Sequence, residues 1–286
     1  MNMKRTRSPQ ALLRGDTSHS GVLFTARIFL SRVAAVVVVF ACIAAGSAKA
    51  DPTDADVTVM IATIDERQEN SGDYRSIAYL EQKEKGKADV AFEIEFFRRD
   101  ADDKLMILFT KPKNEAGKGY LRLDKNLFLY DPTVGKWERR TERERIGGTS
   151  SNRQDFDESR LADEYTAKFV AMEKLGKFAV THLTLTAKAE VDVAFPTVEL
   201  FVGPDGNVLK REDKALSGKL QRTTYYPKWN KIFSESKKAD VYIPAEIRIF
   251  DEVLKGNSTI IIIKTTDLRA LDANLFTKAW LESKSR

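Results

Sequence analysis

The chain has 286 residues, a formal net charge of +5 and a single cysteine. One cysteine supplies neither a disulfide framework nor a cluster of metal-binding thiolates, so packing alone has to hold the fold. The first fifty residues hold seven of the 47 Lys and Arg but only one of the 42 Asp and Glu. Residues 51–286 are therefore almost neutral, with 40 basic against 41 acidic side chains, and this balance argues against nucleic acid as a partner.

The first fifty residues carry the pattern of a secretion signal. Basic residues precede an uncharged apolar run, Val33–Ala45, which has the length of a signal core and is too short to span a bilayer. Ala48-Lys49-Ala50 then gives the small-x-small pattern that a signal peptidase recognises, and Asp51-Pro52 ends the apolar segment. We therefore expect cleavage after Ala50 and a mature protein that works in the periplasm.

Cys42 lies inside the apolar run and not at its end. A lipoprotein acylation site needs a small residue two positions before the cysteine, where this chain has Phe40. The alternatives to cleavage are acylation of Cys42, which would make the protein a tethered acceptor, and retention of the segment as an anchor. The expected organisation is a cleavable signal over residues 1–50 and one domain over residues 51–286, a length that can bury a substantial core.

The first predicted element of the mature chain is an amphipathic helix over Pro52–Glu69. Its apolar residues recur at three- and four-residue spacing, namely Val57, Met60, Ile61 and Ile64. Proline suits the first turn of a helix, and Asn70-Ser71-Gly72 ends this one.

Beyond residue 72 the apolar period changes to two, which is typical of half-buried strands. The polar break Asp100–Asp103 predicts a hairpin of Ala91–Arg98 and Lys104–Phe109, and it lacks the spaced oxygen ligands and closing glutamate of a calcium loop. Further strands are predicted over Gly119–Asp124, Asn126–Tyr130, Lys136–Arg140, Ala167–Lys174, Lys177–Lys188, Thr197–Val202, Val208–Lys214, Lys219–Tyr226, Tyr242–Phe250 and Ser258–Asp267.

Three segments interrupt or end this series of strands. Ile146–Asn152 has the composition of a flexible loop, and Gln154–Tyr165 after it is expected to form a short helix that carries Phe156 and Leu161. A terminal helix is expected over Asp272–Ser283. The prediction is thus about ten to twelve strands, with a helix at each end and one in the middle.

Residues with chemical potential are few and scattered. His182 is the one histidine beyond the signal, and no Gly-x-Ser-x-Gly motif accompanies it. Gly117-Lys118-Gly119 lacks the remaining residues of a phosphate-binding loop. Asp155, Asp157 and Glu158 are interpreted as complements to a helix N-terminus. We therefore expect no enzymatic activity, no cofactor and no metal.

Three strands are apolar on both faces, although antiparallel strands usually leave one face to water. They contain Leu105–Phe109, Leu127–Tyr130 and Ile260–Ile263. Either these strands are central and covered on both sides, or one face lines an apolar cavity for an acyl chain.

A series of short motifs, in this order and spacing, resembles the outer-membrane lipoprotein-sorting proteins, the LolA/LolB-like family. The motifs are Phe109-Thr110-Lys111-Pro112, Gly117–Leu121, Leu127–Pro132, Lys136 with Arg139, Gly147-Gly148-Thr149, Asp155-Phe156-Asp157, Ser217–Leu220, Thr224–Tyr226 and Phe276–Glu282. They cover nearly all of the mature chain. The sequence departs from the family at Phe128, where relatives often have tryptophan.

The resemblance implies a mainly β fold, an incomplete antiparallel β-barrel wrapped over helices that act as a lid. It implies a periplasmic carrier that binds acyl chains of lipoproteins or lipids in an apolar cavity and delivers them toward the outer membrane. A non-catalytic accessory module of an inner-membrane transporter and a lipid-anchored acceptor are the alternatives. We expect a monomer.

Strand alternation places a set of apolar side chains in the implied cavity. The expected lining residues are Phe92, Ile94, Phe96, Ile107, Phe109, Leu121 and Leu129. The expected lid is the Gly147–Asn152 stretch together with Phe156 and Leu161.

Overall fold

The computed structural model describes residues 51–123, 126–141 and 143–285. The predicted signal, its cleavage site after Ala50 and Cys42 lie outside the described residues and stay predictions.

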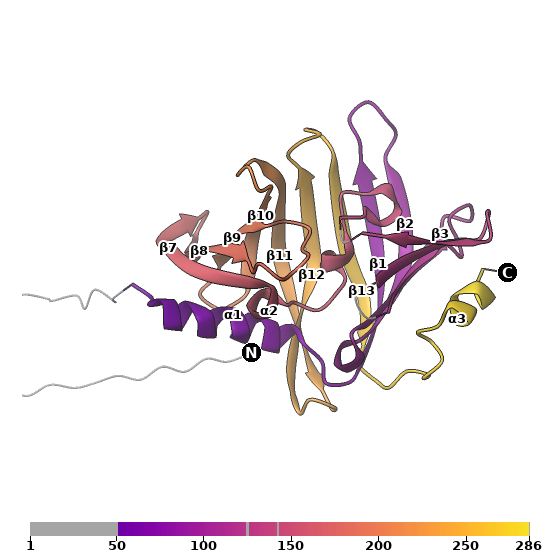
Figure 1. Ribbon diagram of the computed structural model, residues 1–286, viewed down its shortest axis with the longest axis horizontal. Coiled ribbons are helices and arrows are strands. Elements are labelled where there is room, and N and C mark those ends of the chain that lie inside the picture. Colours follow the sequence, from indigo (N-terminus) through magenta and orange to yellow (C-terminus); the bar gives the residue numbers. More distant parts are fainter. Residues whose placement is uncertain (1–50, 124–125, 142, 286) are drawn as a thin grey trace, which may run out of the picture. The chain divides into compact units, whose positions relative to one another are not determined.

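The described residues form one open antiparallel sheet (Figure 1). Its strands are β1 (Asp73–Lys83), β2 (Val90–Arg99), β3 (Lys104–Lys111), β4 (Gly119–Leu123), β5 (Asn126–Asp131), β6 (Lys136–Arg140), β7 (Tyr165–Leu175), β8 (Phe178–Ala187), β9 (Thr197–Val202), β10 (Val208–Lys214), β11 (Leu220–Ser234), β12 (Ala239–Asp251) and β13 (Ser258–Asp267). Their order is β6-β5-β4-β3-β2-β1-β13-β12-β11-β10-β9-β8-β7, so β1 and β13 join the two halves while β6 and β7 are the edges. The described chain is thus mainly β, with one antiparallel sheet that stays open and does not close into a barrel, which confirms the expected fold class.

The longest hairpin differs from its prediction. The prediction ended one strand at Tyr226, yet β11 continues through Pro227 to Ser234. The pairing of β11 with β12 shifts register between Tyr225 and Lys228. A bulge at this point accommodates a proline that cannot donate to the ladder, so the strand passes through it.

The first helix, α1 (Asp54–Gln68), forms close to the predicted bounds. The hydroxyl of Thr53 accepts a hydrogen bond from the backbone of Asp56, whose carboxylate accepts one from the backbone of Thr53 in return. This capping box fixes where the helix begins. Val57 and Ile61 are buried as their spacing predicts. None of the described helices is both long and apolar enough to cross a bilayer.

The predicted middle helix is wrong in extent. Gln154–Tyr165 contains only the end of a 3-10 turn, η3 (Arg153–Asp155), and one turn of helix, α2 (Leu161–Glu164). In this stretch the side chains of Asp155 and Asp157 pair with arginines of the sheet, and such tertiary contacts override the local preference for a helix. The terminal helix α3 (Lys278–Ser283) is likewise shorter than predicted, because turns occupy its first half.

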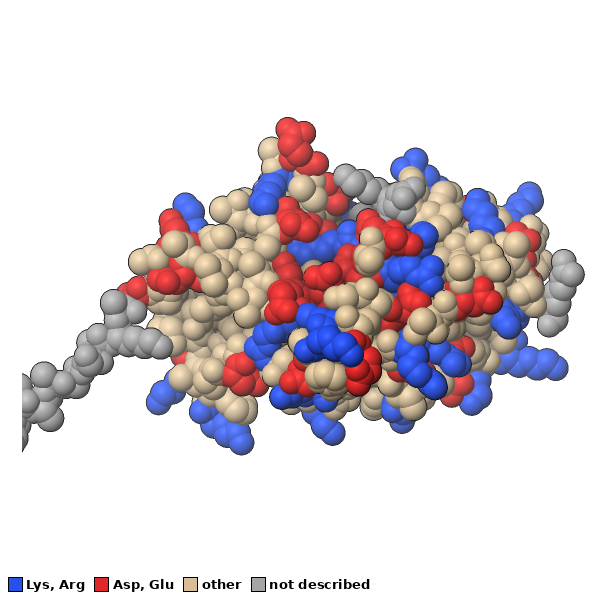
Figure 2. Space-filling view, turned by 90° about the horizontal axis from the view of Figure 1, so that it is seen from below, with Lys and Arg blue, Asp and Glu red and all other residues tan. Residues whose placement is uncertain are grey.

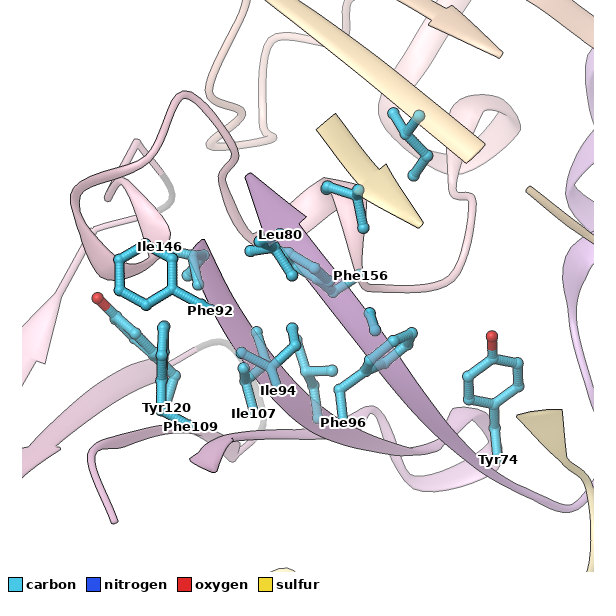
Figure 3. Packing of buried hydrophobic residues seen from close by; sticks show 14 of the residues in the cluster. Tyr74, Leu80, Phe92, Ile94, Phe96, Ile107, Phe109, Tyr120, Ile146 and Phe156 are labelled. Atoms are coloured by element: carbon cyan, nitrogen blue, oxygen red, sulfur yellow. The ribbon is translucent and has the colours of Figure 1, made fainter. Parts of the chain in front are cut away.

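The sheet has an inner face, covered by α1 and by residues 145–164, and an outer face, covered by residues 271–285. One large apolar cluster on the inner face combines β1 to β5 with β12 and β13 (Figure 3). A second inner cluster combines β7 to β10 with α1. The outer face carries a smaller cluster that includes Met106, Leu108 and Leu281. Leu105–Phe109 is therefore apolar on both faces because chain segments cover it on both sides.

Candidate functional site

Residues 145–164, which we call the strap, cross the inner face of the sheet. The strap begins with the short turn η2 (Ile146–Gly148), in which Ile146 is fully buried. A Cβ atom at Gly147, which has φ +61°, would lie 2.6 Å from the ring of Phe109. The close approach and the left-handed backbone both require glycine there. The start of the strap thus packs closely against the ring of Phe109 on the inner face.

The loop predicted to be flexible is buried and hydrogen-bonded. The backbone N–H of Ser150 donates to Gln82 Oε1 at 3.0 Å and to Thr259 Oγ1 at 2.7 Å. Thr149 and Ser151 are fully buried beside it. Polar side chains of the sheet therefore anchor this part of the strap.

Six of the seven predicted lining residues share the large inner cluster with Phe156. They are Phe92, Ile94, Phe96, Ile107, Phe109 and Leu129, the last only partly buried. The ring of Phe156 meets that of Phe96 edge to face at 5.6 Å between centroids (Figure 3). The strap thus fills the space above these side chains with its own aromatic ring.

Leu121 is the exception, because it lies on the outer face with Leu281. The register pairs Tyr120 with Ile107 and Leu121 with Met106, so Tyr120 takes the inner position. Successive side chains of a strand point to opposite faces, so Leu121 points to the outer face. The expectation that it lines the inner face is therefore corrected.

Leu161 is buried, but in the second inner cluster and not beside Phe156. The backbone N–H groups of Leu161 and Ala162 donate to the carboxylate of Asp65 on α1, at 3.0 and 2.6 Å. Burial raises the pKa of Asp65 despite these hydrogen bonds. Leu161 therefore ties the end of the strap to α1.

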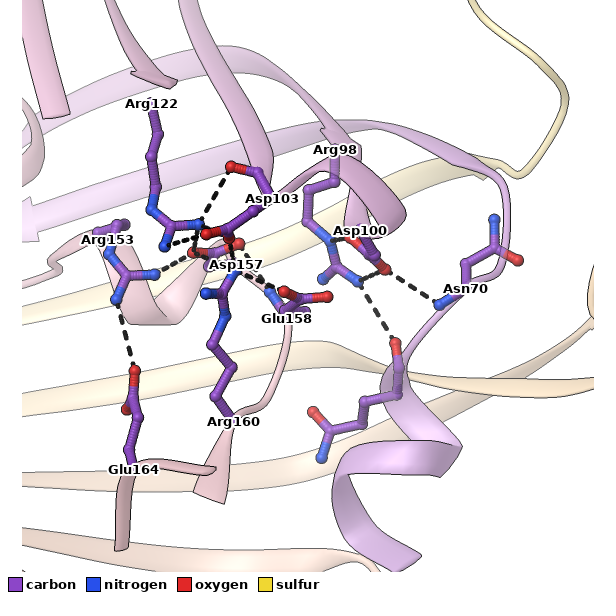
Figure 4. Close-up of polar contacts among 11 residues, drawn as sticks. Asn70, Arg98, Asp100, Asp103, Arg122, Arg153, Asp157, Glu158, Arg160 and Glu164 are labelled. Carbon is purple, nitrogen blue, oxygen red and sulfur yellow. Dashed lines mark hydrogen bonds and ion pairs between the residues drawn. The ribbon is translucent and has the colours of Figure 1, made fainter. Parts of the chain in front are cut away.

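Asp157 is the centre of a buried ion-pair network (Figure 4). Its carboxylate is only 3% exposed and pairs with Arg153 on the strap and, at 3.4 Å, with Arg122 on β4. Arg160 lies 4.0 Å from the same carboxylate and also pairs with Asp103. Burial by itself would raise the pKa of Asp157, but the guanidinium groups lower it to about 2. The group is therefore ionised at every physiological pH.

Glu158, the next residue, behaves in the opposite way. Its carboxylate lies 2.5 Å from Arg160, yet burial raises its pKa to about 7. The nearby charges of Asp100 and Asp157 add to this rise. The strap consequently holds a carboxyl group that changes its charge near neutral pH.

A second network fixes the strap to the middle of the sheet. Asp155 pairs with Arg222 on β11 at 2.7 Å, and Arg222 pairs with Asp213 on β10 at 2.8 Å. Arg211 pairs with Asp213 at 2.6 Å and donates to Gln154 Oε1 at 3.1 Å. Burial would raise the pKa of Asp213, but Arg211 and Arg222 hold it below its usual range.

The interpretation as a complement to a helix N-terminus holds for Asp155, whose carboxylate accepts a hydrogen bond at 2.8 Å from the backbone N–H of Asn152 at the start of η3. The networks correct it for Asp157 and add a second role for Asp155. Both carboxylates bind arginines that the sheet presents on its inner face. The sequence contained one indication of these networks. Arg122 and Arg211 stand at strand positions whose side chains point to the inner face. A charged residue at such a position needs a buried partner. Over the face seen in Figure 2, acidic and basic side chains are likewise intermingled.

Little empty space remains beneath the strap. The cavity there has a volume of about 90 Å³ and is lined by aromatic residues, among them Phe96, Phe156 and Tyr226, and by charged residues of the networks. Pockets for small molecules usually measure about 300–1,000 Å³. A long ligand can therefore occupy the inner face only after the strap moves.

His182 lies apart from the strap. Its Nε2 is 3.0 Å from a carboxylate oxygen of Glu199, and its ring stacks on Phe201 with centroids 4.4 Å apart. These contacts give the histidine a structural role on its strand.

Comparisons with known proteins identify a family and a fold. A family model described as an uncharacterized protein matches residues 101–283. A search of curated protein sequences finds no match.

Three solved structures superimpose well on the chain. A LolA superfamily protein from Nitrosomonas europaea is 19% identical, with a TM-score of 0.66 over 78% of this chain and 97% of that one. A putative outer membrane lipoprotein-sorting protein domain from Vibrio parahaemolyticus is 15% identical, with a TM-score of 0.69 over 80% of this chain and 100% of that one. A DUF1329 family protein from Desulfovibrio piger is 17% identical, with a TM-score of 0.68 over 81% and 100%. At these identities the similarity establishes the fold.

Proposed function

Since the chain belongs to the uncharacterized protein family whose model matches residues 101–283, and has the LolA-like fold, we propose that it is a non-catalytic periplasmic carrier. In this proposal it binds the acyl chains of lipoproteins or lipids on the inner face of the sheet and delivers them toward the outer membrane.

The observation that carries the proposal is the position of Phe156. Its ring is 1% exposed and lies within the largest apolar cluster. The residues on both sides of it, Asp155 and Asp157, bind the sheet through ion pairs and not through apolar packing. Withdrawal of the strap would uncover a continuous apolar surface while leaving the sheet ladder intact.

The energetics of such a surface suit transport. Burial of an acyl chain contributes ~0.8 kcal/mol per CH₂ group, so one long chain supplies several kcal/mol. The strap covers the same surface with two of its own side chains, Ile146 and Phe156, which are buried there. It therefore competes with an acyl chain for this surface. Binding and release therefore become an exchange between the strap and the cargo, and neither state needs extreme affinity.

A second candidate function is an accessory module that docks on an inner-membrane transporter. The small cavity of about 90 Å³ favours this alternative, since a filled inner face does not need a cargo. Native mass spectrometry of the protein purified from the periplasm separates the two. Stoichiometric lipid supports the carrier, whereas an empty protein with a co-purifying transporter supports the accessory module.

Replacement of Phe156 tests the carrier function directly. Phe156→Ala removes the ring that fills the inner face, so a fluorescent fatty acid should bind more tightly than to the unmodified protein. Phe156→Asp places a charge in the apolar cluster and should weaken binding. Phe178→Ala is the matched control, because Phe178 is 44% exposed on β8. Equal binding by all four proteins would contradict the proposed site.

A further inference from the structure

A second hollow lies beside the start of the strap and has a volume of about 770 Å³. This size falls within the range of small-molecule pockets, about 300–1,000 Å³. Its walls come from the strap, from the end of β12 and from the turns after β10 and β12. Those two turns lie at the same end of the sheet (Figure 1). The hollow is open while the space beneath the strap is nearly filled.

One of its buried polar lining residues is Arg222 on β11. The side chain is 5% exposed, and its Nε and Nη1 atoms bind Asp213 and Asp155. Its Nη2 atom is buried and has no hydrogen-bond partner among the described residues. The hydroxyl of Ser150, which lines the same hollow, is also buried and without such a partner in the described part of the chain. An unsatisfied buried polar group costs about 1–3 kcal/mol, so a ligand that satisfies both gains affinity.

The chemistry of these atoms selects an oxyanion. A guanidinium N–H only donates hydrogen bonds, and a serine hydroxyl can donate as well, so the complementary group is an acceptor such as a carboxylate or phosphate oxygen. Arg143 and Arg145 line the rim of the hollow and are exposed. Asp251 is the one acidic residue among the described lining residues, and its carboxylate already pairs with Arg145. Arg145 and Arg222 therefore have carboxylate partners, and the exposed Arg143 adds positive charge to the lining.

Part of the lining of the hollow is apolar. Leu216 is 89% exposed and Leu254 is 54% exposed, and both line the pocket. Single exposed leucines are ordinary on protein surfaces, but here two of them border the pocket that holds the unsatisfied donor of Arg222. A cationic end and an apolar wall together match a molecule with an anionic head and an aliphatic tail.

We infer that this hollow binds the head group of an anionic amphiphile, either the carboxylate of a fatty acid or the phosphate of a phospholipid. The inference deepens the proposed carrier function and rests on it, because it names the class of cargo. The head-group oxygens accept hydrogen bonds from Arg222 Nη2 and Ser150 Oγ, and the first part of the tail lies along Leu216 and Leu254.

Isothermal titration of the purified protein with four probes tests the inference. The probes are oleate, lysophosphatidylglycerol, the uncharged monoolein and inorganic phosphate. Oleate and lysophosphatidylglycerol distinguish the two sources of the anion, and at least one of them should bind about tenfold more tightly than monoolein. Phosphate, which has no tail, should bind more weakly than that amphiphile.

Variants that leave the strap networks intact assign the binding to this hollow. Arg143→Gln, outside the strap, should weaken binding of the anionic amphiphile about tenfold and leave monoolein unchanged. Arg139→Gln on the edge strand β6 removes the same charge from an exposed position and should have no effect. Leu216→Asn, which removes the apolar side chain without adding a charge, should weaken binding of the amphiphile without changing that of phosphate.

Three outcomes overturn the inference while leaving the carrier function in place. The first is equal affinity for oleate, lysophosphatidylglycerol and monoolein, and the second is an equal loss in Arg143→Gln and Arg139→Gln. The third is phosphate that binds as tightly as the amphiphiles. Failure of every amphiphile to bind, in Phe156→Ala as in the unmodified protein, instead removes the carrier function itself.

Discussion

The two faces of the sheet are covered by segments of opposite chemistry. On the outer face, residues 271–285 pack through apolar side chains, and Leu281 is fully buried. Gly119 permits this contact, since a Cβ atom there would lie 2.8 Å from Leu281. On the inner face, carboxylates and arginines hold the strap, and few of its residues are apolar. Apolar packing therefore holds the outer segment on the sheet, whereas ion pairs hold the strap on the inner face.

The two kinds of contact respond differently to changes in charge. Apolar packing is insensitive to pH and to competing ions, so the outer segment behaves as part of the core. Buried ion pairs contribute little net stability over an apolar contact, but they depend strongly on each partner being present and charged. A cover held in this way can be displaced by a small change in charge.

The largest expected effect is at the centre of the strap network. Asp157→Asn leaves the guanidinium groups of Arg153 and Arg122 without their shared carboxylate. We expect a loss of about 3–5 kcal/mol in the free energy of unfolding, together with tighter binding of a fluorescent fatty acid. Urea unfolding and probe titration measure the two. Asp102→Asn, at an exposed carboxylate, is the control, and a loss of stability with weaker probe binding would show that the network does not restrain a lid.

On the outer face, a substitution should change the free energy of unfolding but not the affinity for the fatty acid. Leu281→Ala removes a fully buried side chain, and we expect a loss of about 2–4 kcal/mol. Affinity for the fatty acid should stay unchanged, because this residue lies on the far side of the sheet. Val134→Ala, at a position 59% exposed, should alter neither quantity. If Leu281→Ala changed the affinity for the fatty acid, the outer segment would also affect ligand binding, and the two segments would not differ in this respect.

The pH dependence should reside in the strap. The pKa of Glu158 is raised to about 7 in the folded protein, so the folded state holds this proton more tightly than the unfolded chain. Its contribution is favourable at acidic pH and is lost as the pH rises from the unfolded pKa, near 4.3, through 7. We expect stability to fall by roughly 2–3 kcal/mol across this interval on account of this group.

Glu158→Gln should remove that part of the pH dependence, as urea unfolding at pH 5 and pH 8 will measure. Glu235→Gln is the control, since its side chain is 82% exposed. If Glu158→Gln kept the full difference between the two pH values, the strap would not be the pH-sensitive cover.

The smallest expected effect concerns a cation on the outer cover. The ammonium group of Lys278 lies 4.5 Å from the ring centroid of Phe128 and 5.2 Å from that of Trp137. Lys278→Gln should cost about 0.5–1 kcal/mol, the usual value for an exposed cation–π contact. A larger loss in urea unfolding would mean that charge also holds the outer segment.

The sequence predicted the elements whose pattern is local. Strand alternation and the spacing of Val57 and Ile61 depend on neighbouring residues, so most strands and α1 are found close to their expected positions. The parity of Leu121 could not be derived, because its register is set by pairing with β3. The order of motifs also indicated the LolA-like fold, which the solved structures confirm.

The ion-pair networks could not be predicted in the same way. Asp157 and Arg122 are 35 positions apart, and Asp155 and Arg222 are 67 apart. Only the completed sheet brings β4, β10 and β11 against the strap. Tertiary partners of this kind also override the local preference of Gln154–Tyr165 for a helix, which is why that prediction failed.

Amide hydrogen exchange with and without a bound acyl chain tests the central claim most directly. If the strap is the releasable cover, saturating oleate should speed exchange in Gln154–Glu164, which carries Phe156, and leave Leu275–Lys284 as slow as before. If the strap stays as protected as the core of the sheet while oleate is bound, the cargo does not replace it on the inner face, and the account is contradicted.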